Sequence, residues 1–96
     1  MKNKSILTES IVSQIEDIVA SDIDDEVVMM SVEKGQYYGL DSIGSRVWKL
    51  IEKPIKVSEL IAALILKYDV DRETCTRDVL AFLEKLHEDG ILKVAG

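Results

Sequence analysis

The segment Glu26–Leu40 reads EVVMMSVEKGQYYGL, and it sets the architecture expected for the whole chain. Its first half, Val27–Val32, is a short apolar run rich in β-branched residues, which favours a strand over a helix. A tight turn is predicted at Glu33-Lys34-Gly35, because Gly35 can adopt the positive φ that such hairpin loops require. Gln36–Leu40 then resumes as a second strand. The segment is therefore predicted to be a β-hairpin.

The alternation of side chains along a strand gives this hairpin two faces. One face is expected to carry Val27, Met29 and Ser31, and the other Val28, Met30 and Val32. In a chain this small only one face can cover the helices. The second face is therefore either covered by the N-terminal segment or offered to a partner.

The strand Gln36–Leu40 is expected to lie at an edge of the sheet, because no strand-like segment of any length follows it. An edge strand presents unpaired N–H and C=O groups and invites another chain to pair with it. Pairing with a second chain at this edge is the functional hypothesis from the residues alone. We expect Tyr38→Pro to remove a donor that the incoming strand needs, with Tyr37 pointing to the opposite face.

The residues before the hairpin give a weaker pattern. Met1–Thr8 is expected to be frayed or disordered. Glu9–Ala20 has apolar residues at helical spacing but also reads as a strand. We favour a strand around Glu16–Ser21, because a hairpin alone is marginal in water and a third strand supports it. Asp22–Asp25 is then a turn, since the glycine and glutamate that an EF-hand calcium loop requires are missing at their positions.

Three helices are predicted after the hairpin. They are Ser42–Glu52, capped by Asp41 or Ser42; Val57–Tyr68, with Lys56 as a weak cap; and Arg72–Asp89, capped by Asp71 and ended by Gly90. Pro54 separates the first two. Ile91–Val94 is too short to rank as a sheet strand. Three strands followed by three helices predict an α+β fold, with residues 1–96 forming one domain.

Composition narrows the function classes. The chain has 96 residues, a net charge of −6 and a pI near 4.7, which argues against nucleic-acid binding. Its single cysteine forbids an internal disulfide, and no segment reaches the roughly 20 apolar residues of a membrane span. We expect a soluble, cytoplasmic protein.

The sequence offers few residues in arrangements that enzymes use for catalysis. His87 is the only histidine, so no two-histidine metal site is possible. Cys75 falls on the apolar face of a predicted helix, where a buried, inert thiol is expected. Scattered glycines form no phosphate-binding loop. We expect no enzyme activity, no cofactor and no metal.

Three runs of sequence together resemble the PqqD-like family of peptide-recognition elements. They are VVMMSVEKGQYYGLDSIGSRVW at 27–48, KVSELIAALILKYDVD at 56–71 and DVLAFLEKLHEDGIL at 78–92. The resemblance covers about Ile18 to Leu92. The free-standing form and the segment VASDIDDEVV at 19–28, which leads into the hairpin, look most like the leader-binding protein of lasso-peptide pathways. Asp41 and Lys56 stand where Asn and Thr are common in the family, and both positions concern helix caps.

The resemblance implies a winged-helix-like fold in which a precursor's leader peptide adds as a strand beside the third strand, against the third helix. It implies a backbone ladder at Gln36, Tyr37, Tyr38, Gly39 and Leu40, an apolar groove at Tyr38, Val79, Phe82 and Leu83, and charge contacts at Asp78 and Lys85. Taken one by one, Val79, Phe82 and Leu83 are expected in the core rather than in a groove, although the floor of a groove and a core can share residues. Asp78 and Lys85 lie on one flank of the helix, although the sequence does not say which flank faces the strand. We expect a monomer or weak dimer.

The partners implied are the leader peptide, a cysteine-protease leader peptidase and a cyclase. Two other functions stay open. One is a PqqD-type chaperone of a precursor for a radical SAM enzyme. The more distant one is a winged-helix regulator that binds nucleic acid, which the acidic third helix argues against.

Overall fold

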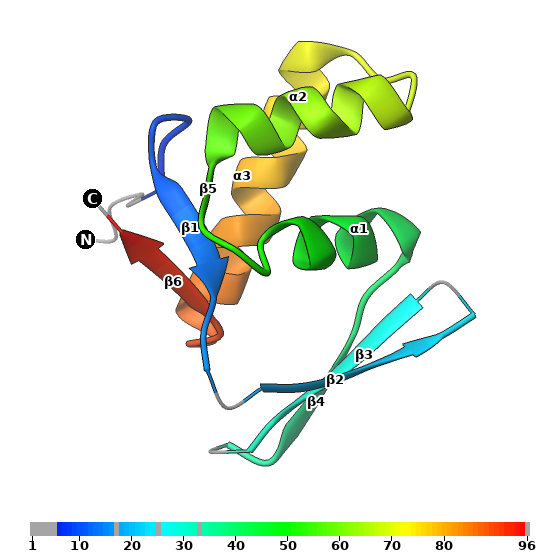
Figure 1. The fold of residues 1–96 in the computed structure, drawn as a ribbon, viewed down its shortest axis with the longest axis vertical. Coiled ribbons are helices and arrows are strands. Elements are labelled where there is room, and N and C mark those ends of the chain that lie inside the picture. Colours follow the sequence, from blue (N-terminus) through cyan, green and yellow to red (C-terminus); the bar gives the residue numbers. More distant parts are fainter. Residues whose placement is uncertain (1–5, 17, 25, 33, 96) are drawn as a thin grey trace.

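The computed structural model describes residues 6–16, 18–24, 26–32 and 34–95. Its elements are β1 (Ile11–Gln14), β2 (Ile18–Ile23), β3 (Glu26–Ser31), β4 (Gln36–Gly39), α1 (Ser42–Leu50), β5 (Ile55–Lys56), α2 (Val57–Lys67), α3 (Arg72–Glu88) and β6 (Leu92–Ala95). Strands β2, β3 and β4 form one antiparallel sheet in that order, and β5, β1 and β6 form a second. Helix α1 lies over one face of the first sheet, and α2 and α3 lie beyond it (Figure 1).

The predicted three-stranded antiparallel sheet followed by three helices is confirmed. Gly35 closes the β3–β4 hairpin with a φ of 65°, and its N–H donates to the Ser31 carbonyl at 2.7 Å. Val27, Met29 and Ser31 are buried beneath the helices, as the alternation predicts. The hairpin therefore turns its apolar face to the core.

Helix ends follow the capping residues in the sequence. The Asp41 carboxylate accepts the Gly44 N–H at 2.7 Å, and the Asp71 carboxylate accepts the Thr74 N–H at 3.0 Å. Lys56 makes no side-chain cap, which is consistent with its weak propensity for that position. Gly90, with a φ of 76°, follows the last turn of α3.

The second sheet was not predicted. β1 pairs with β6 through Val12 and Val94, so the expectation that Ile91–Val94 is no sheet strand is wrong. The expectation that no strand follows Leu40 is also wrong, because β5 pairs with β1 as well. These strands are two to four residues long and pair across most of the chain, so a local pattern does not reveal them.

Two expectations near the N-terminus also need correction. Part of the expected frayed segment, residues 1–5, lies outside the described residues. Ile6, however, is only 1% exposed, and the Thr8 carbonyl accepts the Ser58 N–H at 2.9 Å, so residues 6–8 are tied to the core. The strand expected around Glu16–Ser21 is β2, which continues to Ile23, and the turn begins at Asp24 with a φ of 51°.

The outer face of the β2–β3–β4 sheet is left open by the described part of the chain. Val19, Val32 and Tyr37 are each more than half exposed there. The described N-terminal residues that form β1 do not cover this face, because they join the second sheet instead. None of the helices in the described ranges combines the length and the apolar composition that a membrane crossing needs.

Candidate functional site

The outer edge of β4 offers backbone groups to a further strand. The Leu40 N–H donates to the Val27 carbonyl at 2.9 Å, which makes this a hydrogen-bonded pair. Such pairs alternate along an antiparallel ladder, so Met29–Tyr38 is also hydrogen-bonded, while Met30–Tyr37 and Val28–Gly39 are not. The N–H and C=O of Tyr37 and Gly39 therefore point away from β3, to an edge that no described strand pairs.

This register corrects one expectation from the sequence. The N–H of Tyr38 is bound within the sheet, to Met29, and is not available to an incoming strand. A proline at Tyr38 thus removes a bond that holds the domain together. The donor that a partner strand needs is the N–H of Tyr37.

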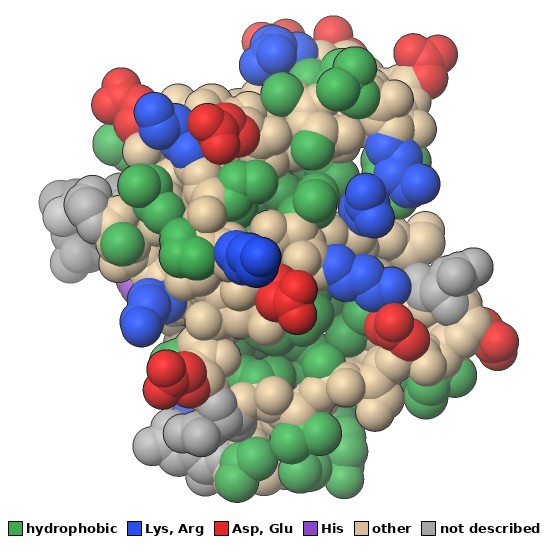
Figure 2. All heavy atoms as spheres, in the orientation of Figure 1, with side chains coloured by type: hydrophobic (Ala, Val, Ile, Leu, Met, Phe, Trp, Pro, Cys, Tyr) green, Lys and Arg blue, Asp and Glu red, His purple; other side chains and the backbone are tan. Residues whose placement is uncertain are grey.

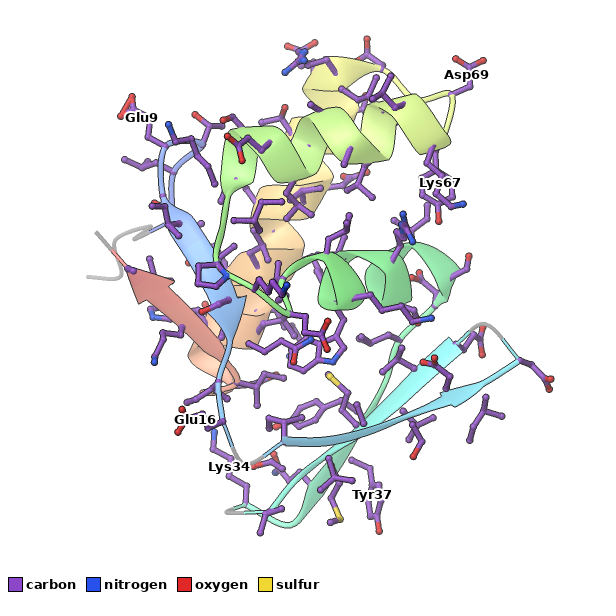
Figure 3. The ribbon with its side chains drawn as sticks, viewed as in Figure 1. Glu9, Glu16, Lys34, Tyr37, Lys67 and Asp69 are labelled. Carbon is purple, nitrogen blue, oxygen red and sulfur yellow. The ribbon has the colours of Figure 1, made fainter. Side chains whose placement is uncertain are left out.

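The side chains of β4 divide as the sequence predicted. Tyr37 is 74% exposed and lies on the side of the sheet away from the helices (Figure 3). Tyr38 is half-buried against the core, and its hydroxyl donates to the Gln36 side-chain oxygen at 2.9 Å. At Gly39 an added Cβ would meet no atom within 4 Å, so the backbone there is open to approach.

One flank of α3 faces this part of the molecule. Phe82 lies on it, with ring carbons 3.4 Å from the position of a Cβ on Gly44. At the C-terminal end of α3 the Lys34 ammonium, from the β3–β4 hairpin, donates to the Asp89 carbonyl. The 3.6-residue period places Asp78 and Lys85 on the same flank as Phe82. The sequence leaves open which flank of α3 faces the edge of β4, and the flank that carries Phe82 is the candidate.

The α3 residues predicted to line the groove differ in exposure. Val79 and Leu83 are buried in the core, at 4% and 0% exposed. Phe82 is half-buried, and Asp78 and Lys85 are exposed. Phe82 and Tyr38 are thus partly accessible, whereas Val79 and Leu83 are not.

The two charged residues already have ion-pair partners, one on α3 and one directly after it. Asp78 lies 3.8 Å from the Arg77 guanidinium, and Lys85 lies 3.6 Å from the Asp89 carboxylate. The Asp78–Arg77 pair is exposed on both sides, and such pairs contribute little to stability, typically about 0.2–1 kcal/mol. A charged ligand therefore competes only with weak intramolecular partners.

A small apolar hollow that the sequence did not predict lies beside the N-terminal half of α3. It has a volume of about 80 Å³ and is lined by Ile43, Leu64, Tyr68, Val70, Thr74, Cys75, Asp78 and Val79. Ile43 and Val70 are partly exposed at its rim. One residue in the sequence could have indicated this hollow. Val70 is an apolar residue between two acids in the α2–α3 loop, where it has no role in forming a helix.

No catalytic arrangement emerges in the described part of the chain. No group of three or more His, Cys, Asp or Glu side chains comes together there as a metal site would need. Cys75 is buried, as expected, and burial, with a smaller effect of Asp78, raises the pKa of its thiol above the ordinary value. A raised pKa lowers the thiolate fraction and so the reactivity of the group.

Solved structures share this fold. TbiB1 in complex with the TbiA(beta) leader peptide is 38% identical, with a TM-score of 0.79 over 84% of this chain and 94% of that one. A lasso peptide synthetase B1 complexed with the leader peptide is 20% identical, with a TM-score of 0.76 over 85% and 96%. The PqqD truncation of Methylobacterium extorquens PqqCD, described as a RiPP recognition element, is 20% identical, with a TM-score of 0.78 over 94% and 96%.

Sequence comparison agrees with the structures. None of the curated proteins matches the chain. The family model of coenzyme PQQ synthesis protein D (PqqD) matches residues 26–92, which run from the first residue of β3 to the first residue of β6. This match covers more than half of the chain, and the 38% identity to TbiB1 extends over most of both proteins. The chain therefore belongs to the PqqD family.

Proposed function

We propose that this protein binds the leader segment of a ribosomally made precursor peptide by β-strand addition to β4. The observation that carries the proposal is the outward direction of the N–H and C=O groups of Tyr37 and Gly39 at an open edge. TbiB1, at 38% identity, is described in complex with a leader peptide. In this mode of recognition main-chain hydrogen bonds provide affinity, and pockets for alternate side chains provide specificity.

The geometry divides the proposed site residues by role. Tyr37 and Gly39 bond the leader through their backbones, while Gln36, Tyr38 and Leu40 hold β4 to β3. Alternate leader side chains then point towards Tyr38 and Phe82, above the buried Val79 and Leu83. Asp78 and Lys85 flank this groove and read charges on the leader. The remaining leader side chains lie on the outer face beside Tyr37.

The further step of the proposal is delivery. Once bound, the leader is presented to a leader peptidase and a cyclase in lasso-peptide biosynthesis, and the protein itself takes no catalytic part. The similarity to a lasso peptide synthetase B1 that is described in complex with the leader peptide supports this pathway. The match to the PqqD family model supports the alternative, a precursor chaperone for a radical SAM enzyme.

Amide hydrogen exchange tests the edge directly. The TbiA(beta) leader peptide serves as the first probe, and the leader of the protein's own precursor as the second. Binding is expected to slow exchange at Tyr37 and Gly39, because these amides gain a partner, and to change Tyr38 little, because its amide is already bonded. The same measurement monitors β2, whose alternate residues Ile18 and Ala20 point their amides to the opposite edge. Protection at Ala20 without protection at Tyr37 would move the site to β2 and contradict the proposal.

A further inference from the structure

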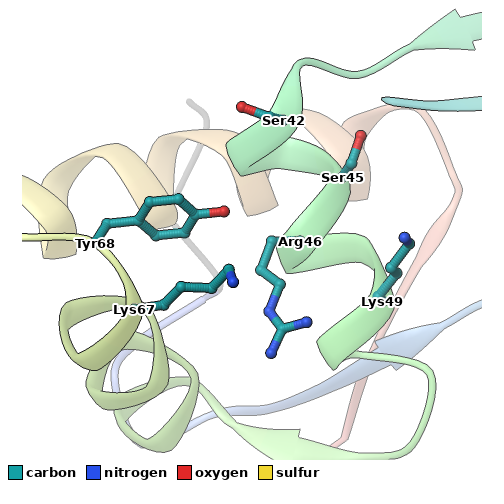
Figure 4. A pocket seen from close by; sticks show the side chains of 6 residues that line it. All are labelled: Ser42, Ser45, Arg46, Lys49, Lys67 and Tyr68. Atoms are coloured by element: carbon teal, nitrogen blue, oxygen red, sulfur yellow. The ribbon is translucent and has the colours of Figure 1, made fainter. Parts of the chain in front are cut away.

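A cleft between α1 and the C-terminal end of α2 gathers positive charge in a protein whose net charge is −6. The cleft has a volume of about 360 Å³ and is lined by Ser42, Ser45, Arg46, Lys49, Lys67 and Tyr68 (Figure 4). No acidic residue is among them. Figure 2 shows Lys and Arg side chains gathered over this part of the face. The chain has 18 acidic residues and 12 Lys and Arg residues, so composition does not favour a cleft whose charged lining residues are all cations.

Helical geometry explains how the cleft forms. Ser42, Arg46 and Lys49 follow one another at i, i+4 and i+7, so they share one stripe of α1. Gly44, on another side of the same helix, packs against Phe82 of α3. The stripe thus faces α2 and β2 and is turned away from the α3 groove. Lys67 reaches it from the end of α2, with its ammonium 5.9 Å from the centre of the Tyr68 ring.

Two of the lining polar groups are already used within the protein. The Lys49 ammonium lies 3.2 Å from the Asp22 carboxylate. The Ser45 hydroxyl accepts the Val27 N–H at 2.7 Å and donates to the Leu40 carbonyl at 3.3 Å. Ser45 is therefore a structural residue that joins α1 to the hairpin.

The other four polar groups remain available. Arg46 and Lys67 have no carboxylate partner within the described part of the chain. Nor do the hydroxyls of Ser42 and Tyr68 have a hydrogen-bond partner among the described residues. In Figure 4 the Tyr68 hydroxyl and the Lys67 ammonium both point from α2 towards α1. The cleft thus presents donors from two helices.

We propose that this cleft is a binding site for an oxyanion, a carboxylate or phosphate group carried by a second molecule. A guanidinium and an ammonium supply only donors, and a guanidinium fork matches the two oxygens of a carboxylate or phosphate. The absence of a lining carboxylate makes the cleft unsuited to a metal ion or an organic cation. A glutamate-rich peptide and free phosphate carry the same chemistry, and experiment separates them.

The test is a titration of ¹⁵N-labelled protein followed by NMR at constant ionic strength. Sodium phosphate and the peptide acetyl-Glu-Glu-amide are the two probes, and sodium chloride corrects for screening. We expect saturable shifts confined to the amides of 42–46 and 67–68. Saturation with phosphate alone identifies a free phosphate ligand, and saturation with the diglutamate peptide identifies a carboxylate ligand. Linear shifts spread over the whole surface with both probes would overturn the proposal.

Matched variants locate the site. Arg46→Gln and Lys67→Gln are exposed changes and should leave the melting temperature unchanged, while each weakens binding of the saturating probe at least about tenfold, the change that 1.4 kcal/mol produces. Lys53→Gln removes the same charge from the exposed α1–α2 loop, outside the cleft, and should leave affinity within about twofold of the parent. An equal loss in Lys53→Gln would show that net charge alone attracts the anion, and would contradict a built site.

This inference does not depend on the leader-binding proposal. The cleft lies between α1 and the end of α2, and no residue of β4 lines it, so Arg46→Gln should leave the exchange rates of Tyr37 and Gly39 in the leader complex unchanged. Failure of the anion titration with intact leader protection refutes the cleft alone. Failure of leader protection with intact anion binding refutes the edge alone.

Discussion

Replacing Tyr37 by proline separates the two sets of hydrogen bonds on β4. The N–H of Tyr37 points to the open edge, so proline removes a donor to the incoming strand without removing a bond to β3. Proline is tolerated on edge strands when the missing N–H faces solvent. The free domain should therefore fold, while the leader should lose one ladder bond and meet the proline ring.

The expected loss follows from the arithmetic of a single ladder bond. The hydrogen bond contributes about 0.5–1.5 kcal/mol net, and leaving the leader carbonyl unpaired costs about 1–3 kcal/mol. Because the second figure already includes the lost bond, the expected loss is about 1–3 kcal/mol. This corresponds to an affinity about 5- to 150-fold lower. Fluorescence anisotropy with a labelled leader peptide measures this, and Tyr37→Phe is the control because it keeps the ladder and the ring.

Tyr38→Pro is the internal comparison. It removes a bond between β4 and β3, so we expect it to destabilise the free domain by at least about 1 kcal/mol, which lowers the melting temperature by about 4–8 °C in a domain of this size. If Tyr37→Pro folds normally and binds the leader as tightly as Tyr37→Phe, strand addition at β4 is refuted.

Two further predictions concern the groove. Leader affinity should change less than about tenfold between 50 and 200 mM salt, whereas proteins that neutralise phosphates lose about 10³ or more of their affinity over that range. Duplex DNA should not bind. Tight DNA binding that weakens steeply with salt would instead indicate a nucleic-acid regulator. Asp78→Lys should leave stability within about 0.5 kcal/mol, since Asp78 is exposed, and should weaken leader binding by about 1–3 kcal/mol, with partial rescue by the opposite charge change in the leader. Because Thr76 lies on the other flank of α3, a binding loss at Thr76→Lys together with a neutral Asp78→Lys would place the groove on that flank.

Local sequence patterns specified the elements that depend on neighbours along the chain. The positive φ of Gly35 and the caps at Asp41 and Asp71 each depend on residues a few positions away, and all three appear as predicted. The alternation of Val27, Met29 and Ser31 also needed only the two-residue period of a strand. The order of the predicted strands and the family resemblance both indicate an open edge at Gln36–Leu40.

The tertiary structure decided what depends on pairing between distant segments. β1 and β6 are four residues each and carry little signal alone, yet they pair across about eighty positions because Val12 and Leu92 share one core. Register decided that Tyr37, and not Tyr38, offers its amide to a partner, since the hydrogen-bonding sense of a strand is set by its neighbour and not by its own side chains. The cationic cleft of Arg46 and Lys67 likewise arises only when helices far apart in sequence are packed together.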